Sequence, residues 1–118
     1  FKKVNDSYGH DIGDMVLAGI AQTLVENVTE ECIVSRWGGE EFLIIFPNMN
    51  GDDAKSIVDV IRSRIKKIDF DTGSKTFNIT VTYGLAEYGF DGDAKAVVKE
   101  ADDKLYLGKE NGRDQIVF

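Results

Sequence analysis

Two adjacent glycines lie between two apolar runs, the second of which contains the most apolar run of the chain, and this arrangement restricts the fold more than any other feature. The run "CIVSR" lies before "WGG". Glu40 follows "WGG", and the run "EFLIIFP" begins directly after Glu40. A glycine pair between two apolar runs is typical of a β-hairpin, because glycine adopts the positive φ of a tight turn at little cost. The sequence therefore predicts two antiparallel strands joined at Gly38 and Gly39.

Three segments carry the three-to-four-residue spacing of apolar side chains that is typical of amphipathic helices. The first runs from Asp14, which can cap a helix, to Val28, and it predicts a helix over residues 14–28. The second starts at Asp53 and includes Ala54, Ile57, Val58, Ile61, Ile65 and Ile68. The third is expected to start within "FDGDA" and to end near "KENGR", where Gly112 suits a C-terminal cap.

Strand periodicity is clearest in "KTFNITVTYGLAEY", where apolar and polar residues alternate from Phe77 to Tyr83. The short apolar run "QIVF" predicts a last strand, so the expected order is helix, strand, strand, helix, strand, helix, strand. With 118 residues, of which 42% are hydrophobic, the chain fits one domain. We expect an α/β sandwich with a largely antiparallel sheet and flanking helices.

Composition excludes several classes of partner. The net charge of -7 argues against binding to nucleic acid polymers or to anionic membranes, because those surfaces attract clustered cations. Cys32 is the only cysteine, so no internal disulfide can form, and no leader-like segment opens the chain. We therefore expect a cytoplasmic domain. No apolar run approaches the roughly 20 residues of a membrane-spanning helix, so any membrane anchor of the parent protein would lie outside this segment.

The stretch "GGEEF" combines groups that suit a phosphate and a metal ion. Glycines let a phosphate approach the backbone, and carboxylates at a strand end are the hard oxygen ligands that Mg²⁺ prefers. On a strand Glu40 and Glu41 would point to opposite sides, so the two carboxylates are expected to play different roles. The alternative is a plain hairpin tip with solvated carboxylates. The residues alone leave both interpretations open.

Two further clusters are candidates for binding a nucleotide. Near the start of the chain, the Asp14 carboxylate can accept two hydrogen bonds from guanine, and the Asn5 amide offers a donor and an acceptor. In the alternative interpretation Asp14 caps a helix, Asn5 stabilises a turn and His10 is solvated. Near the end, Lys109 and Arg113 lie four residues apart, so they would share one face if the helix continues through them, and they could clamp a triphosphate. The same pair could instead complement the helix dipole.

Three motifs in this order and spacing resemble one known family. "FKKVNDSYGHDIGD", "RWGGEEF" and "ADDKLYLGKENGR" are similar to the GGDEF family of diguanylate cyclases, in its Glu-containing form, and the resemblance covers essentially the whole chain. It implies a palm-like fold, related to nucleotidyl cyclases and polymerases, over residues 1–118. It also implies that two GTP molecules are joined into cyclic di-GMP with release of pyrophosphate, with Mg²⁺ or Mn²⁺ as cofactor. Because each domain would hold one GTP, a transient or stable homodimer is expected.

The resemblance assigns roles to individual residues. Glu40 matches the metal-binding and catalytic carboxylate, and Glu41 matches the second acidic residue of the signature. Gly38 and Gly39 would lie against the phosphates. The remaining matches are Asn5 and Asp14 for guanine, His10 in the same nucleotide-binding loop, and Lys2, Lys109 and Arg113 for the triphosphate.

Two departures from the family pattern carry expectations of their own. The family supplies a further metal-binding Asp from a strand immediately before "FK", and this chain starts at Phe1. We expect a partial domain without that first strand, weak or inactive as an isolated fragment, within a longer protein that has a sensor or other domains. Many relatives also carry an Arg-x-x-Asp product-binding motif where this chain has Thr29 and Cys32. We expect no product-inhibition site, since threonine cannot replace a bidentate guanidinium.

One alternative function is retained. A non-catalytic GGDEF domain that binds GTP or a protein partner would regulate a neighbouring domain without making product. The intact "GGEEF" and the nucleotide-binding residues favour the enzyme.

Overall fold

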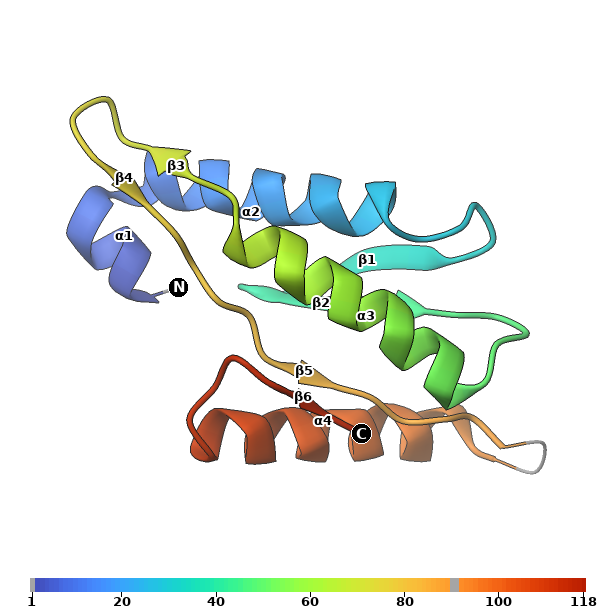
Figure 1. Cartoon of the computed structure of the whole chain (residues 1–118). Helices are drawn as coiled ribbons and strands as arrows, with labels where there is room; N and C mark the ends of the chain where they lie inside the picture. The colour runs from blue at the N-terminus through green and yellow to red at the C-terminus, as the bar shows by residue number, and fades with distance from the viewer. Residues whose placement is uncertain (1, 90–91) are drawn as a thin grey trace. The chain divides into compact units, whose positions relative to one another are not determined.

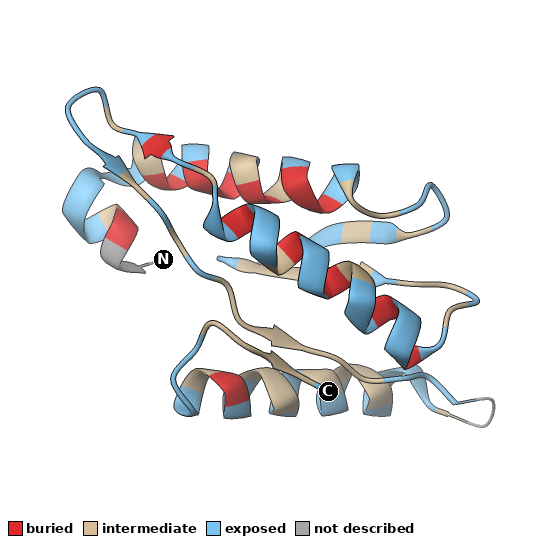
Figure 2. Ribbon diagram, in the orientation of Figure 1, coloured by how far each residue is buried: buried red, intermediate tan, exposed pale blue. Residues whose placement is uncertain are grey.

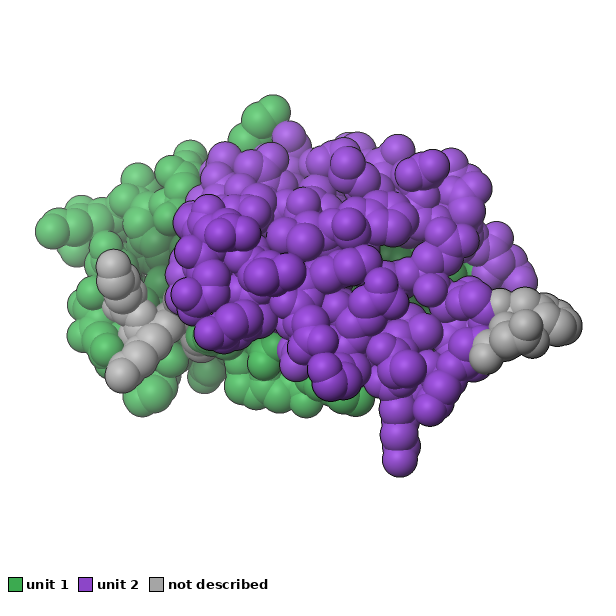
Figure 3. Space-filling view, turned by 90° about the horizontal axis from the view of Figure 1, so that it is seen from below, with its two compact units in different colours: residues 1–47, 67–79 green, residues 48–66, 80–118 purple. Residues whose placement is uncertain are grey.

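The computed structural model describes residues 2–89 and 92–118 (Figure 1). In chain order the elements are α1 (Lys2–Tyr8), α2 (His10–Glu26), β1 (Ile33–Gly38), β2 (Glu41–Ile45), α3 (Gly51–Lys66), β3 (Phe70–Asp71), β4 (Thr76–Phe77), β5 (Tyr83–Gly84), α4 (Ala94–Glu110) and β6 (Ile116–Val117). They fall into two compact units (Figure 3). Unit 1 comprises Phe1–Pro47 and Lys67–Ile79, and unit 2 comprises Asn48–Lys66 and Thr80–Phe118.

In unit 1 the polar start of the chain is helical rather than a loop. Gly9 separates α1 from α2 with a φ of 90°, a conformation that residues with a side chain rarely adopt. Gly9 is the N-cap of α2, and Asp14 lies inside this helix. The predicted start at Asp14 is therefore wrong by about one turn, and Asp14 does not cap the helix. Periodicity missed α1 because, among its described side chains, the helix buries only Val4.

The core of unit 1 is centred on α2. Its buried apolar side chains are Val4, Val16, Leu17, Ile20, Leu24 and Phe70 (Figure 2). Phe70 lies on β3, which forms a small antiparallel hairpin with β4 that the sequence analysis did not predict. The ring of Phe77 on β4 stacks on Tyr8 of α1 and on Phe70, with centroids 4.6 and 5.7 Å apart respectively. These aromatic contacts hold the hairpin against the start of the chain.

The predicted glycine hairpin is confirmed, with its turn one residue further on. β1 and β2 are antiparallel, with Ile33 opposite Ile45 and Gly38 opposite Glu41. The residues between the two strands are Gly39 and Glu40, so Gly38 is the last residue of a strand rather than the first of the turn. The register shifts between Arg36 and Gly38, which is where a β-bulge places an extra residue.

In unit 2 both predicted helices are present. α3 begins two residues before the expected Asp53 and ends before Ile68, and its buried residues are Gly51, Ala54, Val58, Ile61 and Ile65. α4 begins after Asp93, whose side chain accepts the N–H of Lys95 as an N-cap. Phe90 and Asp91, which belong to the predicted start "FDGDA", lie outside the described residues.

The long strand predicted from Phe77 to Tyr83 is wrong. β4 ends at Phe77 and β5 begins at Tyr83, and in the described residues the five positions between them pair with no neighbouring strand. The alternation itself is real, because Phe77 and Ile79 are half-buried while Asn78 and Thr80 are exposed. A strand also requires a partner for its backbone N–H and C=O groups, which periodicity does not report.

The expected α/β class is confirmed. Among the described residues two of the three strand pairs are antiparallel, whereas β5 and β6 run parallel, and α4 packs on both of these strands. Among the described residues no helix is both long enough and apolar enough to cross a membrane.

Candidate active site

The helical start of unit 1 carries three of the predicted nucleotide-binding residues. Asn5 lies on α1 and is half-buried, while His10 and Asp14 lie in the first two turns of α2 and are exposed. The carbonyl of Asn5 accepts the N–H of Gly9 at 2.9 Å, which ties the end of α1 to the start of α2. Within residues 2–89 and 92–118 the Asp14 carboxylate accepts no hydrogen bond. This carboxylate is therefore available to a ligand, as guanine recognition requires. The side chain of Lys2 lies outside what the structure describes.

The tip of the β1–β2 hairpin presents the "GGEE" residues to solvent. Gly39 has a φ of 44°, and Glu40 is exposed beside it in the turn, so the expectation that Glu40 lies on a strand is wrong. Glu41 begins β2, opposite Gly38, and is half-buried. A methyl group on either glycine would have no heavy atom within 4 Å, so the backbone of both is open to an approaching group.

Arg36 fixes the conformation of this tip. Its Nε donates a hydrogen bond to the carbonyl of Gly39 at 2.8 Å, and a terminal nitrogen of the guanidinium donates to the same oxygen. No role for Arg36 was predicted from the sequence. The available signal was its position three residues before Gly39, from which a long side chain can reach back across a tight turn.

A hollow of about 560 Å³ lies beside α2 in unit 1. Asp14 and Arg36 contribute its charged groups, and Phe42 of β2 contributes an aromatic ring. The remaining lining residues are Leu17, Ala18, Ala21, Val25, Val34 and Ser35. The hollow is open to solvent on a wide side, so its volume alone does not mark it as a binding site. The structure thus brings Asp14 together with the hairpin residue Arg36, whereas Glu40 and Glu41 do not line this hollow.

The two predicted phosphate-binding cations near the C-terminus belong to unit 2. Lys109 lies in the last turn of α4, which ends at Glu110. Arg113 follows the C-cap Asn111 and has a φ of 61°. Its N–H donates to the carbonyl of Gly108 at 2.8 Å, the six-residue bond of a Schellman motif. The condition for Lys109 and Arg113 to share one helix face is not met, because α4 ends at Glu110, between them.

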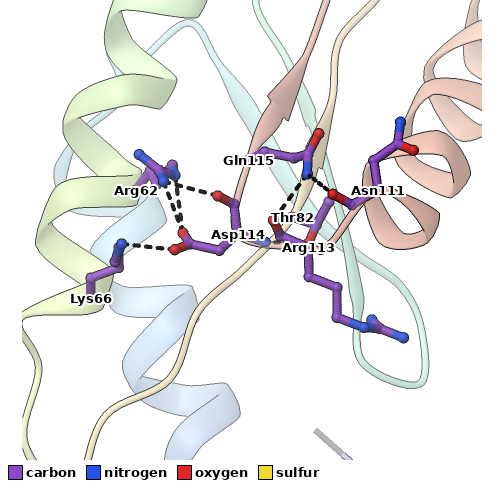
Figure 4. A network of polar contacts seen from close by, with 7 residues as sticks. All are labelled: Arg62, Lys66, Thr82, Asn111, Arg113, Asp114 and Gln115. Atoms are coloured by element: carbon purple, nitrogen blue, oxygen red, sulfur yellow. Dashed lines mark hydrogen bonds and ion pairs between the residues drawn. The ribbon is translucent and has the colours of Figure 1, made fainter.

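The residue after Arg113 anchors this turn. The Asp114 carboxylate accepts hydrogen bonds from Arg62 Nε at 3.1 Å and from Lys66 Nζ at 2.8 Å, both on α3 (Figure 4). Its backbone N–H donates to Thr82 Oγ1 at 3.1 Å. The hydrogen bond from Lys66, followed by the charge of Arg62, lowers the pKa of Asp114 although partial desolvation opposes the shift.

Tyr83 lies close to this network and is the one buried polar side chain without a partner in the described residues. Burial raises the pKa of its hydroxyl, and the negative charge of Asp114 raises it further, whereas the charge of Arg62 opposes the shift. The hydroxyl is therefore neutral at any physiological pH and contributes no charge to the turn.

A comparison with protein families decides the assignment. The family described as "Diguanylate cyclase, GGDEF domain" matches this chain over residues 1–115, which include parts of both units. The chain belongs to the GGDEF family. Its expected palm-like fold is confirmed by the solved structures of family members that it resembles.

Individual relatives support this assignment. Over 119 residues the chain is 34% identical to diguanylate cyclase A of Treponema denticola, covering 100% of this chain but 32% of that protein. A crystal structure of diguanylate cyclase SiaD with its activator SiaC from Pseudomonas aeruginosa matches with a TM-score of 0.94 and 34% identity, over 99% of this chain and 45% of that one. The structure of the active GGEEF domain of a diguanylate cyclase from Vibrio cholerae matches with a TM-score of 0.89 and 30% identity. This match covers 98% of this chain and 74% of that one. The chain therefore spans about a third of the curated relative.

GGDEF diguanylate cyclases generally depend on a divalent metal ion. No group of three His, Cys, Asp or Glu side chains in the described residues could enclose one. Mg²⁺, however, is commonly bound by one or two carboxylates, with substrate phosphates and water completing the shell. The Glu40 carboxylate, exposed at the hairpin tip, would supply one such ligand, so this tip fits a metal ion that arrives with a nucleotide.

Proposed function

We propose that the natural protein, through the GGDEF domain to which residues 1–118 belong, catalyses the condensation of two GTP molecules into cyclic di-GMP, with release of pyrophosphate. The observation that carries the proposal is the hairpin tip, where two open glycines adjoin two carboxylates on a turn held by Arg36. A solvated turn would not require Gly38, because its φ is not positive. The relatives' names support the same chemistry, and the domain is inferred to act in the cytoplasm, where GTP is available.

Guanine recognition is assigned to the helical pair of unit 1. The ionised Asp14 carboxylate accepts hydrogen bonds from the N–H groups of guanine, and the Asn5 amide binds a neighbouring edge. His10 lies between these two residues in the chain and contacts the same nucleotide. Adenine presents a different pattern of donors, so this pair selects GTP over ATP.

The phosphates are assigned to cations and to the hairpin tip. Lys2, Lys109 and Arg113 bind the triphosphate, and Arg113 offers two parallel N–H donors that match phosphate oxygens. Gly38 and Gly39 let a phosphate approach the backbone. Glu40 would hold the metal ion, Mg²⁺ or Mn²⁺, which when bound would polarise the α-phosphate and offset the charge that develops in the transition state.

The reaction needs two copies of the chain. The 3′-oxygen of one GTP forms a bond to the α-phosphorus of the other, the bond from that phosphorus to the bridging oxygen breaks, and pyrophosphate leaves. A carboxylate of the Glu40–Glu41 pair accepts the hydroxyl proton. Because each domain carries one guanine-binding pair, two domains meet as a transient or stable homodimer. The second bond forms by the same step with the roles of the two GTP molecules exchanged.

Product inhibition through the position used by many relatives is not expected. The Thr29 hydroxyl and the Cys32 sulfur lie 3.4 Å apart in the turn before β1. Neither side chain provides the planar cation that would bind a guanine edge or a phosphate of cyclic di-GMP.

Incubation of the natural protein with GTP and Mg²⁺, followed by mass spectrometry of the products, tests the proposal. We expect cyclic di-GMP and pyrophosphate from GTP, and no cyclic product from ATP. GTP binding without turnover would contradict the proposal and favour the non-catalytic alternative. If the enzyme is active, added cyclic di-GMP should inhibit no more strongly in the wild type than in a Thr29→Ala variant.

A further inference from the structure

The turn that carries Arg113 is held in an uncommon backbone conformation. Arg113 and Asp114 have φ values of 61° and 46°, so two consecutive residues with side chains adopt the left-handed region. This region is disfavoured for such residues, because the Cβ atom crowds the backbone carbonyl. A strained conformation of this kind persists only where surrounding contacts determine it.

Those contacts come from Asp114 and Gln115, and together we call them the turn brace. The Asp114 carboxylate is bound by Arg62 and Lys66 of α3, and its N–H is bound by Thr82. Arg62 also donates from a terminal nitrogen to the backbone carbonyl of Asp114 at 2.9 Å. From the other side, the Gln115 amide donates to the carbonyls of Asn111 and Arg113, both at 3.1 Å (Figure 4).

The brace fixes the backbone of Arg113 but leaves its guanidinium uncommitted. Across residues 2–89 and 92–118 the Arg113 side chain forms no hydrogen bond or ion pair. Figure 4 shows the side chain extending away from the Asp114 carboxylate and from the two cations that bind it. The acidic neighbour is therefore neutralised by Arg62 and Lys66, and it does not pair with Arg113.

We propose that Asp114 is a positioning residue, which holds Arg113 in the left-handed conformation so that its guanidinium is directed at the substrate triphosphate. The inference rests on the proposed role of Arg113 in binding GTP. Asp114 touches no substrate in this account. It acts by removing the conformational freedom that Arg113 would otherwise lose on binding, since preorganised groups lose less entropy when the ligand arrives.

Steady-state kinetics of the natural protein and its Asp114→Ala variant test this role. Removing the carboxylate should raise KM for GTP about ten-fold and change kcat by less than about two-fold, because the lost contribution is to binding of the triphosphate. Asp114→Asn keeps the shape and one acceptor for Arg62 but loses the charge, so its KM should lie between the two. Asp103→Ala is the matched control, since it removes a carboxylate that pairs with Lys99 on the exposed face of α4. That variant should behave as the wild type.

A double-mutant cycle separates positioning from general stability. If Asp114 acts through Arg113, the Arg113→Ala/Asp114→Ala double variant should have the KM of Arg113→Ala alone. Independent, multiplying effects of the two substitutions would overturn the proposal, as would an unchanged KM in Asp114→Ala. Hydrogen exchange measured by mass spectrometry without nucleotide gives a second readout. The peptide containing residues 113–115 should exchange faster in Asp114→Ala, and unchanged exchange would also overturn the proposal.

The failure of the inference can be told apart from failure of the proposed function. If the wild type makes cyclic di-GMP and Arg113→Ala raises KM, but Asp114→Ala does not, the function stands and the positioning role is wrong. If the wild type neither binds nor converts GTP, the proposed function fails and the positioning role fails with it, whatever the exchange experiment shows about the brace.

Discussion

The guanidinium of Arg36 donates two hydrogen bonds to the backbone carbonyl of Gly39, and this contact closes the β1–β2 turn beside Glu40. Arg36→Ala should therefore lower the free energy of unfolding by about 0.5–1 kcal/mol, because these hydrogen bonds are exposed to solvent. The value of kcat/KM should fall several-fold, because the tip loses its fixed conformation. Arg64→Ala removes another exposed arginine, from the last turn of α3, and should change neither quantity. Equal kinetics for Arg36→Ala and Arg64→Ala would contradict a role for Arg36 in the active site.

The two glycines of the hairpin should respond differently to alanine, and this difference separates the turn from the phosphate site. Gly39 has a φ of 44°, so Gly39→Ala should destabilise the protein by about 1–2 kcal/mol. Gly38 lies on a strand with free space around its Cα, so Gly38→Ala should leave the thermal midpoint unchanged. Both variants should nevertheless bind GTP more weakly, because each added methyl group occupies the space in which a GTP phosphate is proposed to bind. Normal GTP affinity in Gly38→Ala would show that this glycine serves the hairpin alone.

Gly108 is required by its neighbours rather than by its backbone conformation. A methyl group there would lie 2.7 Å from Cγ2 of Thr82 and 3.2 Å from Cγ2 of Val117. Gly108→Ala should cost about 1–3 kcal/mol of unfolding free energy, the usual range for overpacking. Thr82→Ser removes the nearer methyl group and keeps the hydroxyl that accepts the N–H of Asp114. Urea denaturation of the double variant should show a loss smaller than the sum of the two single losses, and simple additivity would argue against this contact.

The stabilising contribution of Asp114 should depend on pH in one direction. Lys66 and Arg62 hold its folded-state pKa below the ordinary value of 3.8. A carboxylate with a lowered folded pKa stabilises the protein above the unfolded pKa, and the contribution disappears as the pH falls through the folded value. The difference in unfolding free energy between the wild type and Asp114→Asn should therefore be constant near neutral pH and shrink below pH 3.8. A difference that grew on acidification would contradict the ion-pair network.

Elements with a strong local signal were predictable from the sequence. Helices α3 and α4 follow the apolar period, and the β1–β2 hairpin follows from a glycine pair between two apolar runs. Helix α1 has no apolar period of this kind, because Val4 is its only buried residue among the described side chains. The strand expected through Ile79 and Val81 shows the limit of periodicity, since alternation is local whereas strand pairing depends on a neighbour elsewhere in the chain.

In the candidate site, too, residues with a local sequence signal differ from residues whose partners are distant in the chain. Glu40, Gly39 and Asp14 could be proposed as site residues from short motifs, because the chemistry expected of each is contained within a few residues, and their roles stay predictions. The roles of Arg62 and Lys66 could not, because their partner Asp114 lies 52 and 48 residues further along the chain. Their spacing by four residues on α3 indicated a shared face, but nothing local identified what that face binds. Long-range ion pairs of this kind become visible only in the folded chain.

The most direct test of the central claim, that the hairpin tip catalyses the joining of two GTP molecules, is the rate of cyclic di-GMP formation by the natural protein and its Glu40→Gln variant. Glutamine keeps the size of the side chain but loses the charge that holds the metal ion. The account predicts a loss of at least about 100-fold in kcat, comparable to the loss of a key electrostatic group in other active sites. Glu31→Gln, an exposed residue in the segment before β1, should retain the wild-type rate. Equal rates for the wild type and Glu40→Gln would contradict the account.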